Sequence, residues 1–191
     1  MTEVELKAAL TDAQAAALPE ALPGLGFAPK ASLRETDLYF NGGGERDFRK
    51  TDEALRLRRR RDLDAGTEGT LMTYKGPKED SRSNTRTEHE TSVGDLDTAR
   101  RVLEALGFKA QYTVDKVRRE FSAGDVTLCL DAVEGLGSFL ELEILLEDGD
   151  RNAAVDVLLS LLDRLGISRE ALSRRSYLEL LIASATVKKS S

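Results

Sequence analysis

The sequence predicts an α+β protein in which antiparallel strands close into a barrel with a charged interior and helices packed outside. At least seven segments alternate apolar and charged residues with the period of two that is typical of strands. Acidic and basic residues are segregated by strand, and two amphipathic helices need an apolar surface to cover. For any one strand, a sheet with a hydrated charged face is the alternative. If the amphipathic helices cover the apolar faces of the whole set of strands, the charged faces point into the barrel.

Composition excludes several classes of protein. The chain has 191 residues, of which 40% are hydrophobic, and this suits one domain with a core. No stretch approaches the roughly 18 apolar residues of a membrane span, and the net charge of −6 argues against nucleic-acid binding. Cys129 is the single cysteine, which excludes an internal disulfide and fits a cytoplasmic protein. We expect one catalytic domain over 1–185 and a C-terminal tail over 186–191.

The first elements follow from alternation and capping signals. Residues 3–7, EVELK, alternate charged and apolar side chains and predict a strand. A short helix is expected over 11–18, because Thr11 or Asp12 can cap its N terminus and Pro19 lies near its end.

Four more strands are expected before the middle of the chain. A strand over 31–41 ends in DLYFN, before three glycines. ALRLRRR at 54–60 and TLMTYKG at 70–76 are joined by a turn-like segment and predict a hairpin. A polar loop then leads to TRTEHET at 85–91, which alternates again.

The second half predicts three helices and three strands. The clearest helix is DLDTARRVLEALGF, which Asp95 or Asp97 can cap and which Gly107 ends. The expected helices span 95–106, 151–165 and 176–184, and the expected strands span 112–122, 125–131 and 137–147.

Within each strand the charged positions share one face. Arg56, Arg58 and Arg60 lie on one side of their strand, and Leu55 and Leu57 lie on the other. The same alternation aligns Glu3, Glu5 and Lys7; Thr73 and Lys75; Arg86, Glu88 and Glu90; Lys116, Arg118 and Glu120; and Glu141 and Glu143; it sets Asp131 opposite Val126, Leu128 and Leu130.

Such a lining predicts the chemistry of its ligand. Buried lysine and arginine beside carboxylates are costly unless another charge compensates them. Arginine binds phosphate oxygens in bidentate fashion and lysine attracts them as a point charge. Carboxylate oxygens suit Mg²⁺ or Mn²⁺, which in turn bridge phosphate oxygens. The expected ligand is therefore a metal-bound triphosphate, and the expected cofactor is Mg²⁺ or Mn²⁺.

An ordered set of motifs carries a resemblance to a known family. The motifs are Glu3-x-Glu5-x-Lys7, LRLR (55–58), YKGP (74–77), RTEHE (86–90), KVRREF (116–121), LDAVEGLGSFLELE (130–143) and RSYLELL (175–181). Together they resemble the CYTH superfamily, the triphosphate tunnel metalloenzymes, over nearly the whole chain. DLYFN followed by RDFRKTDEALRLR is most similar to class IV adenylyl cyclases.

The resemblance implies an eight-stranded antiparallel barrel and a role for each charged residue. The implied metal ligands are Glu3, Glu5, Asp131, Glu141 and Glu143. The implied phosphate-binding residues are Lys7, Arg56, Arg58, Lys75, Arg86, Lys116 and Arg118. The implied catalytic residues are Lys7, Lys75, Glu88 and Glu90. Other residues are expected to have no part in the site. Arg59, Arg60 and Arg61 are expected as hydrated charges on the barrel rim, Arg119 and Glu120 as a surface pair, and Tyr177 as a packing residue.

The resemblance implies a cyclase first. The expected reaction converts ATP into cyclic AMP and pyrophosphate, and the resemblance suggests a homodimer. A triphosphatase acting on tripolyphosphate, thiamine triphosphate or a nucleotide is the alternative, because the strand pattern does not encode which phosphorus is attacked. A polyphosphate-binding module without turnover is a third interpretation.

Overall fold

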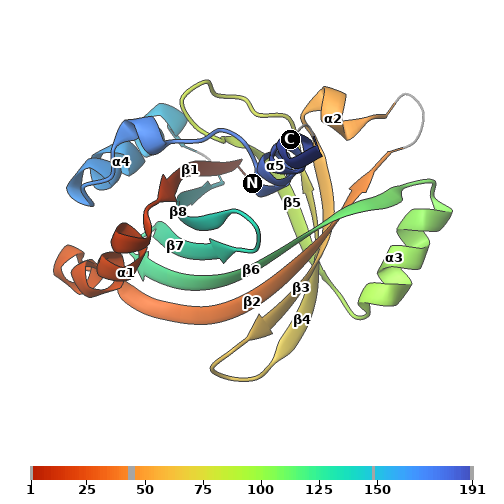
Figure 1. Cartoon of the computed structure of the whole chain (residues 1–191), viewed down its shortest axis with the longest axis horizontal. Coiled ribbons are helices and arrows are strands. Elements are labelled where there is room, and N and C mark those ends of the chain that lie inside the picture. The colour runs from red at the N-terminus through yellow and green to blue at the C-terminus, as the bar shows by residue number, and fades with distance from the viewer. Residues whose placement is uncertain (1, 43–45, 148, 190–191) are drawn as a thin grey trace.

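The computed structural model describes residues 2–42, 46–147 and 149–189. Eight antiparallel strands close into a barrel in the order β1-β5-β4-β3-β2-β6-β7-β8 (Figure 1). The strands are β1 (Thr2–Leu10), β2 (Ala28–Asn41), β3 (Ala54–Asp62), β4 (Glu68–Lys75), β5 (Arg86–Val93), β6 (Lys109–Ala123), β7 (Val126–Val133) and β8 (Gly137–Leu146). The predicted fold class is confirmed.

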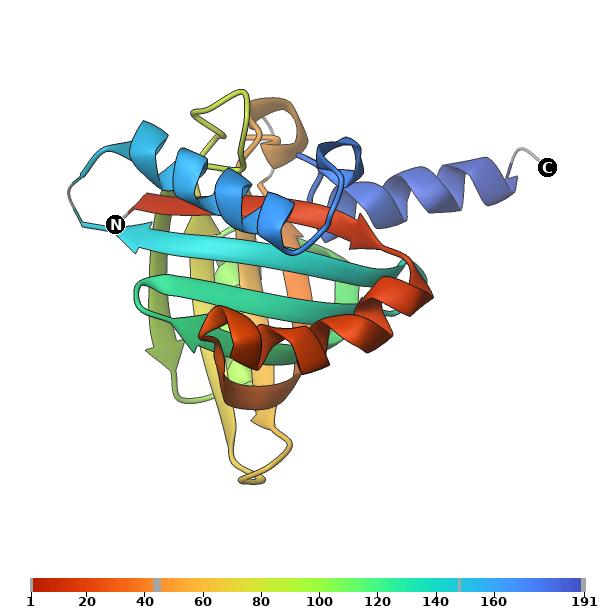
Figure 2. The same cartoon turned by 90° about the vertical axis from the view of Figure 1, so that its left-hand side faces the viewer.

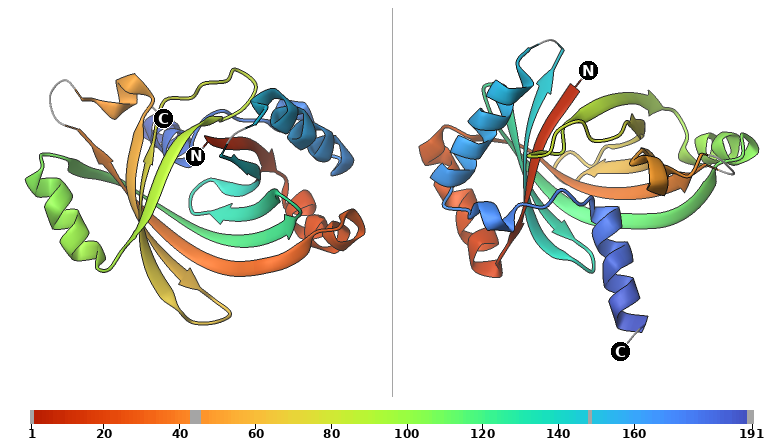
Figure 3. Two further views of the ribbon diagram at one scale, coloured as in Figure 1. Left: turned by 180° about the vertical axis from the view of Figure 1, so that it is seen from behind. Right: turned by 90° about the horizontal axis from the view of Figure 1, so that it is seen from above.

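The helices lie outside this barrel. They are α1 (Asp12–Ala21), α2 (Phe48–Thr51), α3 (Leu96–Ala105), α4 (Arg151–Arg164) and α5 (Tyr177–Lys189), with 3₁₀ turns η1 (Leu22–Leu25) and η2 (Arg169–Ala171). Helices α1 and α4 lie across the outer face of β1, β7 and β8 (Figure 2). Helix α3 lies on the other side of the barrel, and α5 projects away from it (Figure 3). Within the described ranges, no helix combines the length and the apolar character that crossing a membrane requires.

Side-chain caps decide where three helices begin. Thr11 caps α1 in a capping box with Gln14, in which each side chain accepts from the other residue's backbone N–H. The Asp95 carboxylate accepts from the backbone N–H of Thr98 at 2.7 Å and so begins α3. Asp150 caps α4 in the same way. Of the predicted capping alternatives, Thr11 and Asp95 are therefore the residues used.

Several element boundaries differ from the prediction. Strands β2 and β6 begin earlier than expected, because they pair with each other from Ala28 opposite Ser122 to Asn41 opposite Lys109. Helix α1 continues through Pro19, since Leu18 and the following Leu22 are buried in the core and this burial offsets a lost backbone hydrogen bond.

Helix α5 is longer than predicted, and α2 was not predicted. The predicted tail is helical as far as Lys189, because α5 contains no glycine or proline to end it. Residues 190 and 191 of that tail lie outside the described residues. Helix α2 is a single turn, too short to show periodicity. Asp47 caps it, and the Asn41 side chain accepts from the backbone N–H of Phe48 at 2.7 Å.

The main apolar core lies between the barrel wall and the helices. Outward residues of the strands, such as Leu6, Leu128 and Leu142, are buried together with Leu158 and Leu162 of α4. A second cluster, which includes Leu57 and Phe40, is buried with Leu103 of α3. The apolar face of this barrel is therefore its outer face, and most of the charged side chains of the strands occupy the inward positions.

The barrel interior is not uniformly charged. Val114, Val133, Phe139 and Tyr177 form a buried apolar cluster. The three strand residues lie directly opposite Asp37, Lys116 and Asp131 in neighbouring strands. Because paired residues of adjacent strands share a face, this cluster sits inside the barrel and fills part of it. Tyr177, from the start of α5, packs edge-on against Phe139 with ring centroids 5.1 Å apart.

Leu158→Ala tests the external core. Leu158 is fully buried, so the truncation is expected to lower the free energy of unfolding by about 2–5 kcal/mol. Urea unfolding followed by circular dichroism measures the change. Val157 is about half exposed on the same helix, and Val157→Ala is the matched control, with an expected effect within about 0.5 kcal/mol. Equal effects of the two variants would contradict this placement of the core.

Candidate active site in the barrel interior

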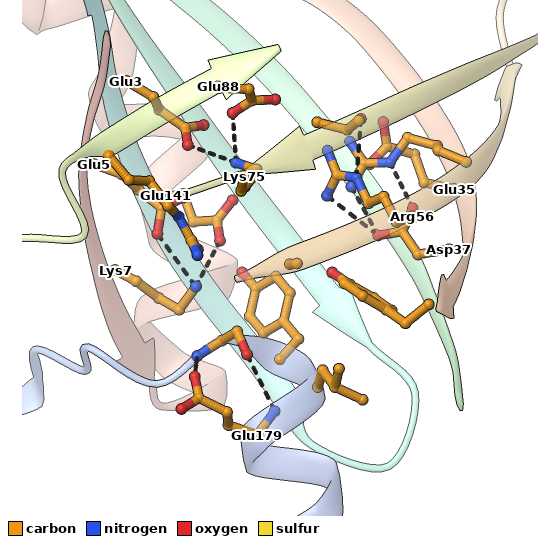
Figure 4. Close-up of a pocket in the computed structure, with 18 of the residues that line it drawn as sticks. Glu3, Glu5, Lys7, Glu35, Asp37, Arg56, Lys75, Glu88, Glu141 and Glu179 are labelled. Atoms are coloured by element: carbon orange, nitrogen blue, oxygen red, sulfur yellow. Dashed lines mark hydrogen bonds and ion pairs between the residues drawn. The ribbon is translucent and has the colours of Figure 1, made fainter. Parts of the chain in front are cut away.

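The inward side chains surround a cavity of about 890 Å³. All eight strands contribute to its lining, and α2 and the first turns of α5 line it as well. Of the residues that the structure describes, twelve acidic and twelve basic ones face it, so this part of the lining carries balanced formal charge. Every site residue predicted from the sequence lines this cavity except Asp131. Figure 4 shows part of this lining, with charged side chains from several strands directed toward one another.

Three carboxylates gather at one part of the cavity, and each cation beside them is shared with another carboxylate. Glu3 and Glu5 point to the same side of β1, and Glu143 lies opposite Glu5 on β8. Each offers one oxygen, and these oxygens all lie within 4.8 Å of one another. Burial, together with the negative charges of Glu3, Glu141 and Glu5, raises the pKa of Glu143 to about 8. A divalent cation would relieve this repulsion, and three carboxylates suit Mg²⁺ or Mn²⁺.

Two lysines lie beside this carboxylate trio, Glu3, Glu5 and Glu143. Lys75 of β4 contacts Glu3 at 2.5 Å and Glu88 at 2.7 Å. Lys7 of β1 is 3.2 Å from both Glu5 and Glu141 (Figure 4). Burial alone would lower the pKa of Lys7, but the two carboxylates outweigh it and raise that pKa above its ordinary value. These contacts favour the charged form of Lys7.

Asp131 is committed to partners of its own. Arg118 of β6 donates to both oxygens of Asp131, at 2.7 and 2.6 Å, and also to Glu141. The Tyr177 hydroxyl donates to Asp131 at 2.8 Å, and the Lys7 ammonium lies 4.5 Å from the Tyr177 ring centroid. Tyr177, expected only to pack, thus also hydrogen-bonds a buried carboxylate and contacts a site lysine.

A second acidic pair lies on β2 and was missed by the sequence analysis. Glu35 and Asp37 are each 1% exposed. Arg58 binds Asp37 at 2.6 Å and Glu35 at 3.0 Å, and Lys116 binds Glu35 at 2.9 Å. Burial alone would raise the pKa of Glu35, but Lys116 and Arg58 lower it to about 2. The signal for this pair was present, since Glu35 and Asp37 occupy alternate positions of a predicted strand.

Two predicted surface assignments are wrong. Arg60 lines the cavity and donates to Glu120 at 2.9 Å, and Glu120 is buried. Arg60 therefore faces the cavity, as its phase with Arg56 and Arg58 implies, although 35% of its side chain is exposed; Glu120 faces inward with Arg118. Arg59 and Arg61 are exposed, as expected of hydrated charges.

Arg86 differs from the other predicted phosphate-binding residues. It is buried on β5 and lines the cavity. Among the described residues its Nε has no hydrogen-bond partner and no carboxylate lies within ion-pair distance of it, although its charge helps to lower the pKa of the more distant Asp52. Arg56, by comparison, donates to Thr73 at 3.3 Å and lies 3.6 Å from Asp37 and 3.8 Å from Glu90. Arg86 is thus the buried arginine with the greatest spare capacity for an anion.

The comparison with protein families agrees with the barrel and its lining. The CYTH domain profile matches residues 1–177. The chain belongs to the CYTH family. Its relatives include a Methanocaldococcus jannaschii protein provisionally named an adenylate cyclase, which is 40% identical over 181 residues, covering 94% of this chain and 98% of that one.

Solved structures contain the same CYTH barrel. A Pyrococcus horikoshii protein is 39% identical and superposes with a TM-score of 0.86, covering 95% of this chain and 99% of that one. A Hippeastrum protein, provisionally named an adenylyl cyclase and described as having a dominant triphosphatase activity, is 19% identical with a TM-score of 0.65, covering 96% and 95%. At that identity the likeness to the Hippeastrum protein shows the fold alone.

Glu35→Gln tests whether the interior depends on ion pairing. The substitution leaves Arg58 and Lys116 buried without one of their carboxylates, so we expect a loss of about 3 kcal/mol at pH 7 in urea unfolding. The folded-state pKa of Glu35 is depressed, so its contribution is complete above its ordinary value of 4.5 and is lost as pH falls toward 2. The difference between wild type and variant should therefore shrink by about 2 kcal/mol by pH 3.

Glu68→Gln is the matched control for this experiment. Glu68 pairs with Arg61 at the surface, where both side chains are more than half exposed, and the change should stay within about 0.5 kcal/mol. A Glu35→Gln effect as small as this control, or one that is unchanged at pH 3, would contradict the paired state of Glu35.

Proposed function

We propose that the chain is a divalent-metal-dependent adenylyl cyclase that converts ATP into cyclic AMP and pyrophosphate. The observation that carries the proposal is one cavity in which a carboxylate trio lies beside a set of buried lysines and arginines. Neither half of this lining suits an uncharged ligand, because each leaves charge that the protein does not fully compensate. The provisional name of the 40% identical relative supports the cyclase reaction in particular.

The proposed metal ligands are Glu3, Glu5 and Glu143. Bound there, Mg²⁺ or Mn²⁺ would neutralise negative charge that develops on the triphosphate. Asp131 and Glu141, the other predicted ligands, are held by Arg118, and Glu141 is held by Lys7 as well. We therefore assign Asp131 to holding Arg118 in place, and Glu141 to the rim of the metal site.

The basic residues would bind and orient the phosphates. Arg86 can bind an anion without giving up a carboxylate, so it is the proposed first contact. The other six predicted phosphate-binding residues would exchange or share their present carboxylate partners with phosphate oxygens; these are Lys7, Arg56, Arg58, Lys75, Lys116 and Arg118. The chain would hold the ribose 3′-hydroxyl in line with the α-phosphorus, and positioning and charge neutralisation would supply most of the rate enhancement.

A triphosphatase is the second candidate function. Glu88 and Glu90 lie beside Lys75 and Arg56 in the cavity wall, and the Glu90 side chain is 38% exposed. A solvent-exposed carboxylate can orient a water molecule toward the terminal phosphorus. The cyclase reaction needs no attacking water. The same lining would then serve tripolyphosphate, thiamine triphosphate or a nucleotide. Cys129, buried as a free thiol, fits the cytoplasmic location that we propose for either enzyme.

A product assay separates the candidates. The purified chain is incubated with Mg-ATP or Mn-ATP and, separately, with tripolyphosphate, and products are resolved by chromatography. Cyclic AMP with an equal amount of pyrophosphate is the expected result. Orthophosphate without cyclic AMP would instead show a triphosphatase. Binding of both substrates without any product would overturn both enzymes and favour a binding module.

Glu5→Ala and Lys75→Ala test the residue assignments. Each removes a charged side chain to which we assign metal binding or phosphate binding. A loss of turnover of at least 100-fold is therefore expected, with an unchanged circular dichroism spectrum. Arg61→Ala removes an exposed charge from the outer face of β3 and should keep wild-type turnover. Full activity in both Glu5→Ala and Lys75→Ala would refute the assignments.

A further inference from the structure

The barrel closes between β1 and β5 through a short seam. Only Thr2 and Glu3 of β1 pair with β5, opposite Thr87 and Arg86. Further along β1, two loop segments supply the missing donors. The backbone N–H of Asn84 donates to the Glu5 carbonyl at 2.9 Å, and that of Ser173 donates to the Lys7 carbonyl at 2.8 Å. The strand that carries Glu5 and Lys7 is therefore held on this side by loops.

Asn84 joins these segments through its side chain as well. It is 2% exposed. Its Nδ2 donates to Glu5 Oε1 at 2.8 Å and to the Ser173 carbonyl at 3.4 Å. Both partners accept hydrogen bonds and neither donates, so the amide nitrogen has to face them. Asn84 Oδ1 is buried and has no hydrogen-bond partner among the described residues. The orientation of the amide therefore leaves its oxygen without a partner while its nitrogen donates twice.

These contacts fix one oxygen of the Glu5 carboxylate. Lys7 lies 3.2 Å from Oε1, the same oxygen that accepts from Asn84. A carboxylate held at one oxygen by two donors cannot rotate freely about its terminal bond. We therefore take Oε2, which neither of these donors contacts, as the oxygen that Glu5 offers to a cation. Lys7 also serves Glu141, whereas the side chain of Asn84 is devoted to Glu5 and to the backbone.

We propose that Asn84 is a positioning residue that orients Glu5 for divalent-metal binding. The inference rests on the proposed function, because it takes the trio of Glu3, Glu5 and Glu143 as the metal site. Asn84 does not line the cavity, so it acts through Glu5 and touches neither metal nor substrate. Partners that hydrogen-bond a ligating carboxylate commonly change metal affinity by 10–100-fold when they are removed.

The test is Mn²⁺ binding to the full chain without nucleotide, measured from the electron paramagnetic resonance signal of free Mn²⁺. Asn84→Ala is expected to raise the dissociation constant about 10-fold or more. Asn84→Ser keeps a polar group in the buried position but is too short to reach Oε1, so the same increase is expected. Ser83→Ala is the matched control: Ser83 is equally buried in the same loop, but its hydroxyl bonds Thr85 and not Glu5.

The outcomes separate this inference from the proposed function. Wild-type affinity in Asn84→Ala or Asn84→Ser, with Glu5→Ala unable to bind Mn²⁺, would overturn the role of Asn84 alone. Equal binding by wild type and Glu5→Ala would overturn the metal site itself. A merely structural Asn84 would lower thermal stability in its variants, as is expected of the Ser83→Ala control, without changing the dissociation constant.

Discussion

The pairing of opposite charges inside the barrel is the constraint on which the rest of the structure depends. Apolar side chains are used on the outer wall, under α1, α3 and α4. Among the described residues, the cavity lining then holds acids and bases in equal number. A single unpaired charge there would cost several kcal/mol. Arg58 with Asp37 and Arg118 with Asp131 show how this cost is reduced, through short bidentate contacts between neighbouring strands.

These pairs also prepare the cavity for an anionic ligand. A cation that already has a carboxylate partner stays charged and ordered in the free protein, so little reorganisation is needed when phosphate arrives. The compensation is uneven in two places. Among the described residues, Arg86 has no carboxylate within ion-pair distance. The cations beside Glu3, Glu5 and Glu143 are all shared with other carboxylates, and burial together with the neighbouring carboxylates raises the pKa of Glu143. The excess positive and negative charges are complementary to a triphosphate and a divalent metal respectively.

Strand periodicity predicted the inside-out barrel because the side-chain period of two assigns every charge to a face. The same periodicity also places Glu35, Asp37 and Arg60 on inward faces. Because Arg60 lies in a run of four arginines at 58–61, it was predicted to be a rim charge instead. Alternation does not say which partner a charge finds across the barrel. The Tyr177 bond to Asp131 and the Asn84 bond to Glu5 join residues far apart in the chain, and their donors lie outside any strand. Such contacts depend on tertiary packing, which no local pattern encodes.

The central claim is that the metal and the triphosphate meet inside the barrel. Diffraction from crystals soaked with Mn²⁺ and a non-hydrolysable triphosphate analogue, collected at the manganese absorption edge, tests it most directly. The account predicts an anomalous peak within coordination distance of Glu3, Glu5 and Glu143, with phosphate density reaching Arg86. A manganese peak on the outer surface, or phosphates bound outside the cavity while the charged pairs stay intact, would contradict it.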